Sequence, residues 1–369
     1  MRILVAMSGG VDSSTVAGLL AEAGHEVIGA TLLLYDHGQA VGRKGACCAG
    51  QDIFDARNVA AHLGIPHYVI DAEERFRKSV IEQFADSYAA GETPVPCVRC
   101  NQSVKFGDLL DLAADLGAEA MATGHYVRRK DGPEGAEMHR ALDTARDQSW
   151  FLFATTRAQL ERSLFPLGEL ANKHEVRAHA ARLGIAVAQK PDSQDICFVS
   201  QGSYSDLVAK LRPEAAEPGE IVSLDGTVLD HHRGLGSYTV GQAKRLGRAT
   251  GDNVVVGLDP STRRVIVGPR QTGNTEVRLR ETNWLIKPPS EPRAIEVKLR
   301  SREPPRKATV IASEDGAIVS LTVAALAAPG QACAFYDGDR ILGGGFICRS
   351  RSDCSPGKTR GGRGNPDTG

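Results

Sequence analysis

Hydrophobic and polar positions follow one rhythm over about the first two hundred residues and another over the rest. In the first part, short apolar runs alternate with segments whose apolar residues return every three or four positions, the period of one helical face. The predicted strands are residues 3–6, 25–34, 67–70 and the run that ends at Met121. The predicted helical stripes are Val16, Leu19 and Leu20; Ile53, Ala56, Ala60 and Leu63; Phe76, Val80 and Phe84; and Phe106, Leu109, Leu110 and Ala113. This alternation predicts an α/β fold with a doubly wound parallel sheet.

A leucine followed by a glycine closes three of the predicted helices, at Gly64, Gly117 and Gly184. Glycine ends helices well because it adopts the left-handed conformation at little cost. Residues 185–188, after the third junction, read as a further strand. Ligands of doubly wound sheets bind where the strands end, so we expect the functional residues in the segments that follow strands.

From about Ser205 onward, short alternating strands and turn residues replace the helical stripes. Asp225-Gly226 predicts a hairpin turn between residues 220–224 and 227–229, and residues 254–258 and 264–267 flank a second turn. Residues 294–299, 307–311, 317–322, 332–335 and 341–347 are predicted as strands of a small β-barrel. We therefore divide the chain into an α/β domain (1–204), a small, mainly β central domain (205–286), a C-terminal β-barrel (287–349) and a disordered tail (350–369).

The composition is that of a globular protein, with 41% hydrophobic residues among 369. No apolar stretch is long enough to span a bilayer and no charged leader precedes the first strand, so we expect a cytoplasmic protein without a membrane partner. The formal net charge of −1 gives no global signal of nucleic-acid binding. Locally, residues 261–310 hold twelve Lys and Arg against five Glu, an excess that either binds backbone phosphates or forms a solvated face.

The sequence Ser-Gly-Gly-Val-Asp-Ser-Ser at residues 8–14 lies between the first predicted strand and the first predicted helix. The glycines let the backbone approach a ligand, and the unpaired N–H groups of a helix start favour an anion, here a phosphate chain. The Gly-Lys-Ser/Thr of a Walker P-loop is absent. Asp12 is a candidate ligand for Mg²⁺, which prefers oxygen. The alternative is a corner whose Ser and Asp only cap the helix.

Eight cysteines are present, at Cys47, Cys48, Cys97, Cys100, Cys197, Cys333, Cys348 and Cys354. In a reducing cytosol we expect no structural disulfides, and most of these thiols should be small buried groups. Cys97 and Cys100 follow two prolines, which predict a loop. A Cys-x-x-Cys pair suits half a zinc site, a redox pair or a nucleophile. Zinc would need a second pair, and the adjacent Cys47 and Cys48 seldom have that geometry.

A third cluster, Lys-Pro-Asp-Ser-Gln-Asp-Ile-Cys-Phe, occupies residues 190–198. Its cysteine, Cys197, stands among polar residues rather than in an apolar run. Taken alone, this cluster also fits a partly buried cysteine that precedes a helix.

The motif Ser-Gly-Gly-x-Asp-Ser resembles the PP-loop of the ATP pyrophosphatases, which cleave ATP between its α- and β-phosphates and transfer AMP to a substrate oxygen. With the Pro-rich Cys segment and Asp-Ser-x-Asp-x-Cys-Phe, in this order and spacing, it resembles the tRNA-specific 2-thiouridylases. The likeness continues through residues 122–126, 146–149, 165–168, 238–242 and 329–331. It implies an adenine nucleotide alpha hydrolase-like first domain, a central domain that contacts tRNA, and an ATP-dependent tRNA-uridine 2-sulfurtransferase.

The resemblance also implies a reaction. AMP is transferred to the 2-oxygen of the wobble uridine and pyrophosphate is released. Cys197 carries the sulfur as a persulfide, and Cys100 attacks the terminal sulfur or liberates it. The reaction yields 2-thiouridine and AMP, and it leaves a Cys100–Cys197 disulfide that a reductant must reopen. Arg99 and Lys190 are expected to favour the thiolates.

The residues expected to line the ATP pocket by this resemblance are Ala6, Met7, Ser8, Gly9, Gly10, Val11, Asp12, Ser13, Leu32 and Gly124. Those expected to contact the target base or the tRNA are Val95, Pro96, Cys97, His125, Arg146, Asp147, Gln148, Arg300, Ser301 and Gln331. Many members have Asp where Cys97 stands and an aromatic residue where Ser301 stands. The extra thiol leaves open a mechanism in which Cys97, Cys100 and Cys197 ligate an iron–sulfur cluster.

Two other functions stay open from the sequence. One is a PP-loop synthetase of the amidotransferase type, although nothing in the chain resembles a glutaminase. The other is a non-catalytic RNA-binding protein, which the basic window supports and the PP-loop opposes. The expected ligands and partners are ATP, Mg²⁺, tRNAs for Lys, Glu and Gln, and a persulfide donor protein. The free chain is expected to be a monomer.

Overall fold

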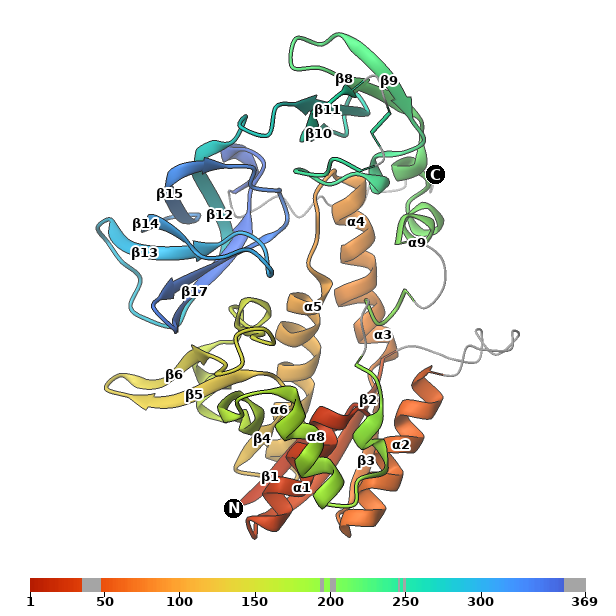
Figure 1. The fold of residues 1–369 in the computed structure, drawn as a ribbon, viewed down its shortest axis with the longest axis vertical. Coiled ribbons are helices and arrows are strands. Elements are labelled where there is room, and N and C mark those ends of the chain that lie inside the picture. Colours follow the sequence, from red (N-terminus) through yellow and green to blue (C-terminus); the bar gives the residue numbers. More distant parts are fainter. Residues whose placement is uncertain (35–47, 193–195, 200–203, 245, 248–249, 355–369) are drawn as a thin grey trace, which may run out of the picture.

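The computed structural model describes residues 1–34, 48–192, 196–199, 204–244, 246–247 and 250–354 (Figure 1). The amino-terminal part is built on a parallel sheet of strand order β3-β2-β1-β4-β7. Its strands are β1 (Arg2–Ala6), β2 (Glu26–Leu33), β3 (His67–Asp71), β4 (Ala120–Ala122) and β7 (Ser163–Leu164). The predicted doubly wound parallel sheet is therefore confirmed.

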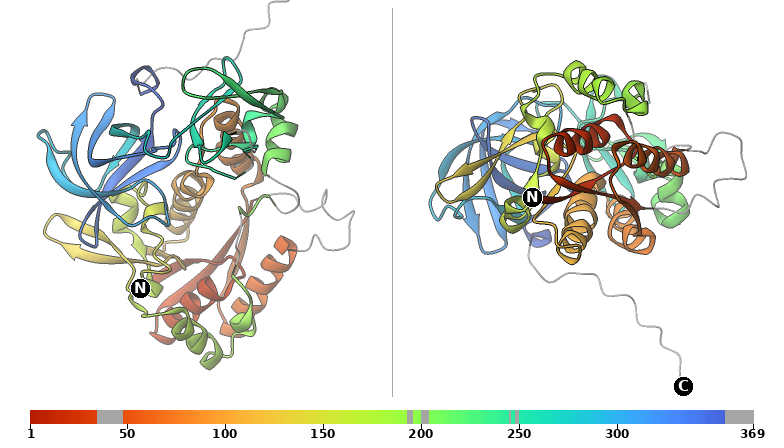
Figure 2. Two further views of the ribbon diagram at one scale, coloured as in Figure 1. Left: turned by 45° about the horizontal axis from the view of Figure 1, so that its top comes forward. Right: turned by 90° about the horizontal axis from the view of Figure 1, so that it is seen from below.

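Helices cover both faces of this sheet (Figure 2). Because side chains alternate along a strand, Ile3 and Val5 of β1 point to one face and Leu4 to the other. Ile3 and Val5 share a core with α1 (Val11–Glu22), α2 (Cys48–Leu63) and α8 (Lys173–Arg182). Leu4 packs in a second core with α6 (Phe106–Asp115). Short helices connect these elements, at α7 (Arg157–Glu161), η3 (Ser149–Phe151) and η4 (Pro166–Glu169).

The three glycines predicted to end helices do so. Gly64, Gly117 and Gly184 have φ angles of 68°, 66° and 68°, the left-handed conformation that side chains disfavour. The strand predicted at residues 185–188 is wrong, because residues 186–189 form the 3₁₀ helix η5 (Ala186–Gln189). The Arg177 guanidinium on α8 donates to the carbonyls of Ala188 and Lys190, which holds this segment against α8 rather than in the sheet.

Two long helices rise from the sheet toward the other domains (Figure 1). The first runs through α3 (Glu73–Phe76), the π-helical segment η1 (Arg77–Glu82) and α4 (Gln83–Ala89). The second runs through α5 (Pro96–Arg99), the π-helical segment η2 (Cys100–Lys105) and α6. The predicted stripe of Phe76, Val80 and Phe84 is buried along the first.

The central domain is a mixed four-stranded sheet of order β10-β11-β8-β9. Its strands are β8 (Gly219–Val222), β9 (Val228–His232), β10 (Val254–Asp259) and β11 (Arg264–Gly268), and α9 (Tyr204–Leu211), η6 (Pro213–Ala216) and η7 (Leu235–Ser237) accompany it. Both predicted turns are present: Gly226 has a φ of 88°, and Asp259 accepts hydrogen bonds from the Ser261 and Thr262 hydroxyls at 2.6 and 2.7 Å.

The C-terminal strands form a six-stranded antiparallel barrel, which pairing of β12 with β17 closes. Five match the predicted strands: β13 (Arg293–Lys298), β14 (Arg306–Ser313), β15 (Gly316–Ala325), β16 (Ala332–Asp337) and β17 (Arg340–Ile347). The sixth, β12 (Asn274–Trp284), lies within the predicted central domain but pairs with β15 and β17. A hairpin of β5 (Val127–Gly132) and β6 (Gly135–Arg140) from the first domain extends the barrel sheet beside β17.

The end of the described chain corrects two expectations. Cys348 and Cys354 form a disulfide, although the sequence predicted free thiols. The segment between them includes the 3₁₀ helix η9 (Arg351–Asp353), so the predicted disordered tail does not begin at Ser350. Residues 355–369 lie outside the described residues. Among the described helices, none is both long and apolar enough to cross a bilayer.

Candidate active site

The PP-loop joins β1 to α1 and is held by its own serines. The Ser8 N–H donates to Ser13 Oγ at 3.0 Å, and Ser13 Oγ donates to the Gly10 carbonyl at 3.3 Å. Gly9 has a φ of 72°, and a Cβ there would lie 2.0 Å from the Asp52 carbonyl oxygen. Gly10 caps α1 without any side-chain hydrogen bond to the first turn. The N–H groups at the helix start are therefore left for a ligand, against the simple capping alternative.

Asp12, in the first turn of α1, is engaged with groups from distant segments. Its carboxylate accepts from the Lys173 ammonium at 2.7 and 2.8 Å and from the Tyr126 hydroxyl at 2.6 Å. The same ammonium contacts Asp192 at 2.7 Å, and Asp192 in turn accepts from Arg146 at 2.7 Å. This ionic chain connects the PP-loop to the segment that precedes Cys197.

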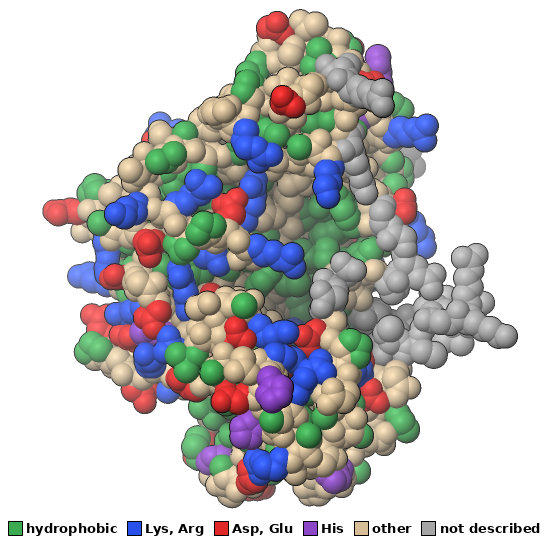
Figure 3. Space-filling view, viewed as in Figure 1, with side chains coloured by type: hydrophobic (Ala, Val, Ile, Leu, Met, Phe, Trp, Pro, Cys, Tyr) green, Lys and Arg blue, Asp and Glu red, His purple; other side chains and the backbone are tan. Residues whose placement is uncertain are grey.

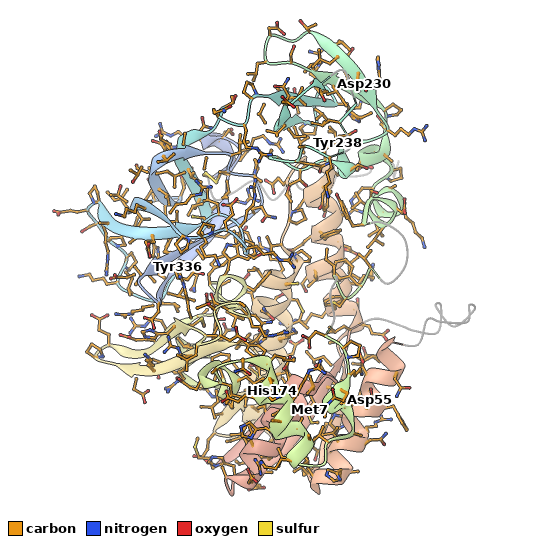
Figure 4. All side chains as sticks on the ribbon, viewed as in Figure 1. Met7, Asp55, His174, Asp230, Tyr238 and Tyr336 are labelled. Atoms are coloured by element: carbon orange, nitrogen blue, oxygen red, sulfur yellow. A yellow bond between two sulfur atoms is a disulfide. The ribbon has the colours of Figure 1, made fainter. Side chains whose placement is uncertain are left out.

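Lys190 ties that segment to the PP-loop a second time. Its ammonium donates to the Gly9 carbonyl at 3.0 Å and pairs with Asp52 and Asp55 of α2 at 2.7 and 2.5 Å. Burial alone would lower the pKa of Lys190, but the two carboxylates raise it. Figure 4 labels Met7 at the end of β1, Asp55 on α2 and His174 on α8, which mark the elements around this site.

The expected apolar lining of the ATP pocket lies at the ends of β1 and β2. Met7 is buried, and its carbonyl accepts from the Thr31 hydroxyl at 2.7 Å. Ala6 ends β1, and Val11 begins α1 in the core. Leu32 of β2 packs against the cluster that contains Cys100. The strand ends thus adjoin both the PP-loop and the thiol region.

Gly124 and His125 connect the nucleotide loop to the helix that carries Cys100. A Cβ on Gly124 would lie 2.9 Å from the Ser13 nitrogen, so only glycine lets this segment approach the start of α1. The His125 ring stacks on Phe106, with ring centres 6.2 Å apart, and its Nδ1 bonds the Thr123 hydroxyl. Burial lowers the pKa of His125 to about 3, so the imidazole is neutral at physiological pH.

The Pro-rich cysteine segment is helical where a loop was predicted. Pro96 is the first residue of α5, a position where its missing N–H and fixed φ are tolerated. Cys97 is exposed on α5, and Cys100 is buried at the start of η2. Such π-helical turns are frequent at functional sites. Pro96 starts this helix, whereas Pro94 lies in residues 92–95, which are not helical, so the predicted loop is present only there.

Cys197 lies in a turn that docks through its neighbour Phe198. The Phe198 ring packs edge-on against Phe76 and Phe84, at 5.7 and 5.4 Å between ring centres. Phe198 also packs against the cluster that contains Cys100. Cys197 as a whole residue is exposed. Residues 193–195 of this motif lie outside the described residues.

The three thiols Cys97, Cys100 and Cys197 share one electrostatic environment. Burial raises the pKa of all three, that of Cys197 to about 11; Cys97 further raises the pKa of Cys100, and Cys97 and Cys100 further raise that of Cys197. The positive charge of Lys105, at the end of η2, lowers the pKa of each of the three thiols. Arg99 was expected to favour the thiolates, but it pairs with Glu281 at 2.5 Å. Lys190, expected to do the same, is bound at the PP-loop, and Lys105 is the cation that the sequence reasoning missed.

The expected contacts with base and tRNA fall into three places. Val95 and Pro96 are buried and border a cavity of about 40 Å³ between α4, α5 and the barrel. Gln331 reaches the same corner, where its amide donates to the Thr93 carbonyl at 3.1 Å. Cys97 follows Pro96 on the same helix.

The second group of expected tRNA-contact residues, Arg146, Asp147 and Gln148, makes hydrogen bonds and an ion pair within the first domain. The Asp147 carboxylate accepts from the N–H and hydroxyl of Ser149 at 3.1 and 2.8 Å. Gln148 exchanges hydrogen bonds with the Tyr126 backbone at 2.9 and 3.0 Å. Arg146 pairs with Asp192, so this group lies beside the ionic chain at the PP-loop.

The third group lies where the central domain meets the barrel. Arg300 donates to the carbonyls of Val240 and Leu326 at 3.1 and 3.3 Å and pairs with Glu303, so it joins the two domains. Its neighbour Ser301 is half-buried in a turn. At least seven of the twelve cations in the basic window form ion pairs, while Arg270, Lys287, Arg302 and Lys307 are exposed. Figure 3 shows Lys and Arg side chains gathered around a hollow whose walls are hydrophobic.

Two inorganic ligands were considered from the sequence: an iron–sulfur cluster at three cysteines and Mg²⁺ at Asp12. Across the described residues, no group of three or more His, Cys, Asp or Glu side chains is placed to hold a metal ion. Cys97, Cys100 and Cys197 are thus not grouped as a ready-made metal site in this structure, and ligation of an iron–sulfur cluster by them stays an alternative. Mg²⁺ commonly takes only one or two carboxylates and otherwise phosphate and water, so Asp12 alone is compatible with it.

Comparison with known families covers nearly the whole chain. The family model described as the tRNA methyl transferase HUP domain matches residues 1–201. The tRNA methyl transferase PRC-barrel domain matches residues 205–269, and the Aminomethyltransferase beta-barrel domain matches residues 274–347. The tRNA-specific 2-thiouridylase MnmA of Acidiphilium cryptum (strain JF-5) is 67% identical over 347 residues, which cover 94% of this chain and 100% of that protein.

The chain belongs to the tRNA-specific 2-thiouridylase family. Two further members of the same name agree: that of Gluconobacter oxydans (strain 621H) is 63% identical, over 94% of this chain and 99% of the relative. That of Paracoccus denitrificans (strain Pd 1222) is 57% identical, over 95% of this chain and 92% of the relative. The predicted family is confirmed, and its PP-loop domain implies the use of ATP.

Proposed function

We propose that this protein catalyses the ATP-dependent 2-thiolation of the wobble uridine in tRNA. One relationship carries the proposal: Gly124 packs on the start of α1, and the adjacent His125 packs on the helix that carries Cys100. These two contacts support a site in which the nucleotide loop and the cysteine helix are joined by one short connection. Relatives named tRNA-specific 2-thiouridylase, identical at up to 67% of positions, support it.

The first step activates the uracil 2-oxygen, which is otherwise a poor leaving group. The uridine oxygen attacks the α-phosphate of ATP, the bond to the β-phosphate breaks and pyrophosphate leaves. The free N–H groups at the start of α1 stabilise the phosphate charge. Mg²⁺ held by Asp12 would neutralise further phosphate charge. The residues proposed for the pocket are Ala6, Met7, Ser8, Gly9, Gly10, Val11, Asp12, Ser13, Leu32 and Gly124.

The second step transfers sulfur. The terminal sulfur of a Cys197 persulfide attacks C2 of the adenylated uracil, a C–S bond forms and the C–O bond to AMP breaks. The Cys100 thiolate then attacks Cys197 Sγ. The S–S bond breaks, and its electron pair stays on the sulfur that becomes the thiocarbonyl. The persulfide and Cys100 each lose a proton, and the disulfide left between the two cysteines is reopened by an external thiol.

The thiol environment suits a reaction gated by substrate. Burial keeps the pKa of Cys197 near 11, so the resting thiol is protonated and weakly reactive. Lys105 is the cation that opposes this shift at all three thiols. We assign it the role of stabilising the thiolate that forms when the substrate is bound.

Partners follow from the same proposal. A persulfide donor protein loads Cys197, and a tRNA for Lys, Glu or Gln supplies the wobble uridine. Its contacts are proposed at Val95, Pro96, Cys97, His125, Arg146, Asp147, Gln148, Arg300, Ser301 and Gln331. We propose that the exposed cations Arg270, Lys287, Arg302 and Lys307 contribute to binding of backbone phosphates. A cytoplasmic location and a monomeric free state remain predictions.

A reconstituted assay tests the proposal. The enzyme is given ATP, a low-molecular-weight persulfide and a tRNA with uridine at the wobble position, and the control tRNA differs only by cytidine there. We expect 2-thiouridine, AMP and pyrophosphate in equal amounts with the first tRNA and none with the second. Cys197→Ser should lose thiolation but retain tRNA-dependent pyrophosphate release.

Each alternative gives a different result in this assay. A pure RNA-binding protein would release no pyrophosphate, and an amidating synthetase would respond to ammonia instead of the persulfide. An enzyme that requires an iron–sulfur cluster would be inactive when purified free of iron. Any of these three results would contradict the proposed function.

A further inference from the structure

Cys100 begins the π-helical segment η2, which packs beside the other π-helical segment, η1. Val80 of η1 and Val104 of η2 share one buried cluster with Cys100. In an α-helix each N–H bonds the carbonyl four residues before it, whereas a π-helical turn bonds the carbonyl five residues before it. The N–H of Phe106, directly after η2, bonds the Asn101 carbonyl in this way. The turn that carries the Cys100 thiol is therefore one residue larger than an ordinary helical turn.

A serine hydroxyl within η2 is bound to the backbone beside Cys100. Ser103 Oγ donates to the Arg99 carbonyl at 2.7 Å. This is the carbonyl that the Ser103 N–H would bind in an α-helix. It belongs to the peptide unit that contains the Cys100 nitrogen, so the hydroxyl holds the plane of that peptide. Such side-chain bonds to the carbonyl four residues back change the local course of a helix.

The direction of the Cys100 side chain depends closely on this backbone. A cysteine has one rotatable bond before its sulfur, so the backbone fixes the few positions that the sulfur can reach. Cys100 is buried, and its charge raises the pKa of Cys197, so the two thiols are near enough to interact. Attack on Cys197 Sγ needs the incoming sulfur in line with the bond that breaks. A small error in the direction of the Cys100 side chain therefore slows this step.

We propose that Ser103 is a positioning residue whose hydroxyl holds the peptide before Cys100, so that the thiol points toward Cys197. This inference rests on the proposed function, because it concerns the attack of Cys100 on the Cys197 persulfide. In that step Cys100 Sγ bonds to Cys197 Sγ, the S–S bond of the persulfide breaks, and its electron pair stays on the sulfur of the 2-thiouridine. Ser103 exchanges no atom in this step and acts only through the backbone of Cys100.

The neighbouring segment η1 offers a matched control. The hydroxyl of Ser79 donates to the Arg75 carbonyl, again four residues back, in a segment that contains no cysteine. Ser79→Ala and Ser103→Ala each remove one hydrogen bond of this kind. Both should change the urea midpoint of unfolding by a similar small amount, whereas only Ser103→Ala should disturb the thiol chemistry.

A single-turnover assay with persulfide-loaded enzyme, ATP and tRNA separates positioning from stability. In Ser103→Ala we expect pyrophosphate release at the native rate, but formation of 2-thiouridine and of the Cys100–Cys197 disulfide about ten- to hundredfold slower. The KM for tRNA under multiple turnover should not change. Ser103→Thr keeps the hydroxyl and should recover most of the native rate. Ser103→Val has nearly the shape of threonine without the hydroxyl, so it should be as slow as Ser103→Ala.

Three results of this assay would overturn the inference. One is a native rate of disulfide formation in Ser103→Ala and Ser103→Val. Another is an equal loss of rate in Ser79→Ala. The third is an equal slowing of pyrophosphate release in Ser103→Ala, which would show a general defect of the site. The comparison of Ser103→Thr with Ser103→Val provides a result even if Ser103→Ala does not fold.

Oxidation of the resting enzyme tests the positioning without turnover. The azo compound diamide takes up two electrons and two protons as the two thiols join, and peptide mass spectrometry follows the Cys100–Cys197 disulfide. We expect this disulfide to form about tenfold more slowly in Ser103→Ala than in the native protein or in Ser79→Ala. If the native protein makes no 2-thiouridine but shows this difference, the proposed function is wrong and the role of Ser103 stands. If it makes 2-thiouridine and Ser103→Ala reacts at the native rate in both assays, only this inference is wrong.

Discussion

Arg99 and Glu281, 182 positions apart in sequence, form a two-armed ion pair between the cysteine helix and the barrel. The two N···O distances are 2.5 and 2.8 Å, and the Arg99 guanidinium also lies 4.1 Å from the centre of the Phe346 ring. Glu281 has a φ of 50°, a left-handed conformation unusual for a residue with a side chain. The pair fixes the barrel against the helix on which Cys97 and Cys100 lie.

Breaking this pair should loosen the cysteine helix. We expect Arg99→Gln and Glu281→Gln each to lower the free energy of unfolding by about 1 kcal/mol, because both side chains are partly exposed and solvent screens them. The double variant should be little worse than either single one. Urea denaturation of all four proteins measures this coupling, and strictly additive losses would show that the two residues act independently.

The pair should also weaken in acid. Burial alone would raise the pKa of Glu281, but the hydrogen bond and charge of Arg99 outweigh it and hold the pKa below its ordinary value. Stability from this carboxylate is therefore complete above its unfolded pKa and is lost as the pH falls through its folded pKa. The coupling measured by the double variant should shrink below about pH 4. A coupling that stays constant into that range would contradict the ionic interpretation.

Gly124→Ala should damage the nucleotide site specifically. The added Cβ would lie 2.9 Å from the Ser13 nitrogen, a backbone atom that cannot rotate away. We expect a loss of about 1–3 kcal/mol in stability, with weaker ATP binding measured by calorimetry. Gly50→Ala is the control, because nothing lies within 4 Å of its Cβ. Native ATP affinity in Gly124→Ala would show that the loop tolerates the shift.

The thiols should react faster as the pH rises. Because burial raises the pKa of Cys197 to about 11, its thiolate is scarce at neutral pH, and its alkylation rate should increase about tenfold per pH unit between pH 7 and 10. Lys105 lowers this pKa, so Lys105→Gln should slow the reaction at each pH. Iodoacetamide rates from peptide mass spectrometry provide the measurement. A plateau near neutral pH would indicate a thiolate already formed in the resting protein.

His125 should make the fold sensitive to acid. Its pKa falls from about 6.5 in the unfolded chain to about 3 when folded, so the unfolded state binds more protons between these values. Stability should therefore decrease by about 1.4 kcal/mol per pH unit relative to His125→Asn as the pH is lowered through this window. Urea denaturation of both proteins from pH 7 to pH 4 gives the difference. A difference independent of pH would mean that the imidazole is not buried as a neutral group.

Much of the fold follows from local pattern. The helical stripes, the left-handed Gly64, Gly117 and Gly184, and five of the six barrel strands depend on residues close in sequence. The strand at residues 185–188 was wrong because Arg177 of α8 binds the carbonyls of Ala188 and Lys190, a side-chain contact that the apolar pattern does not show. β12 was placed in the wrong domain because strand pairing across the barrel is non-local.

Some residues of the candidate site could be recognised from the sequence, and others only from the fold. The PP-loop and the cysteines are visible as motifs, whereas Lys105 and Lys173 stand in ordinary helical sequence and gain their meaning only from what the fold brings to them. The Cys348–Cys354 disulfide was missed because the prediction relied on the expected compartment rather than on geometry. Pairing between charged groups far apart in sequence has no local signature.

The central claim is that one sulfur atom travels from Cys197 to the uridine while Cys100 closes the disulfide. A single-turnover experiment tests it with protein whose cysteines have been loaded with ³⁵S persulfide and freed of excess donor. With ATP and tRNA, we predict label in 2-thiouridine and an equal amount of Cys100–Cys197 disulfide; Cys100→Ser should form no such disulfide. Label in the tRNA from Cys197→Ser protein treated in the same way would contradict the account.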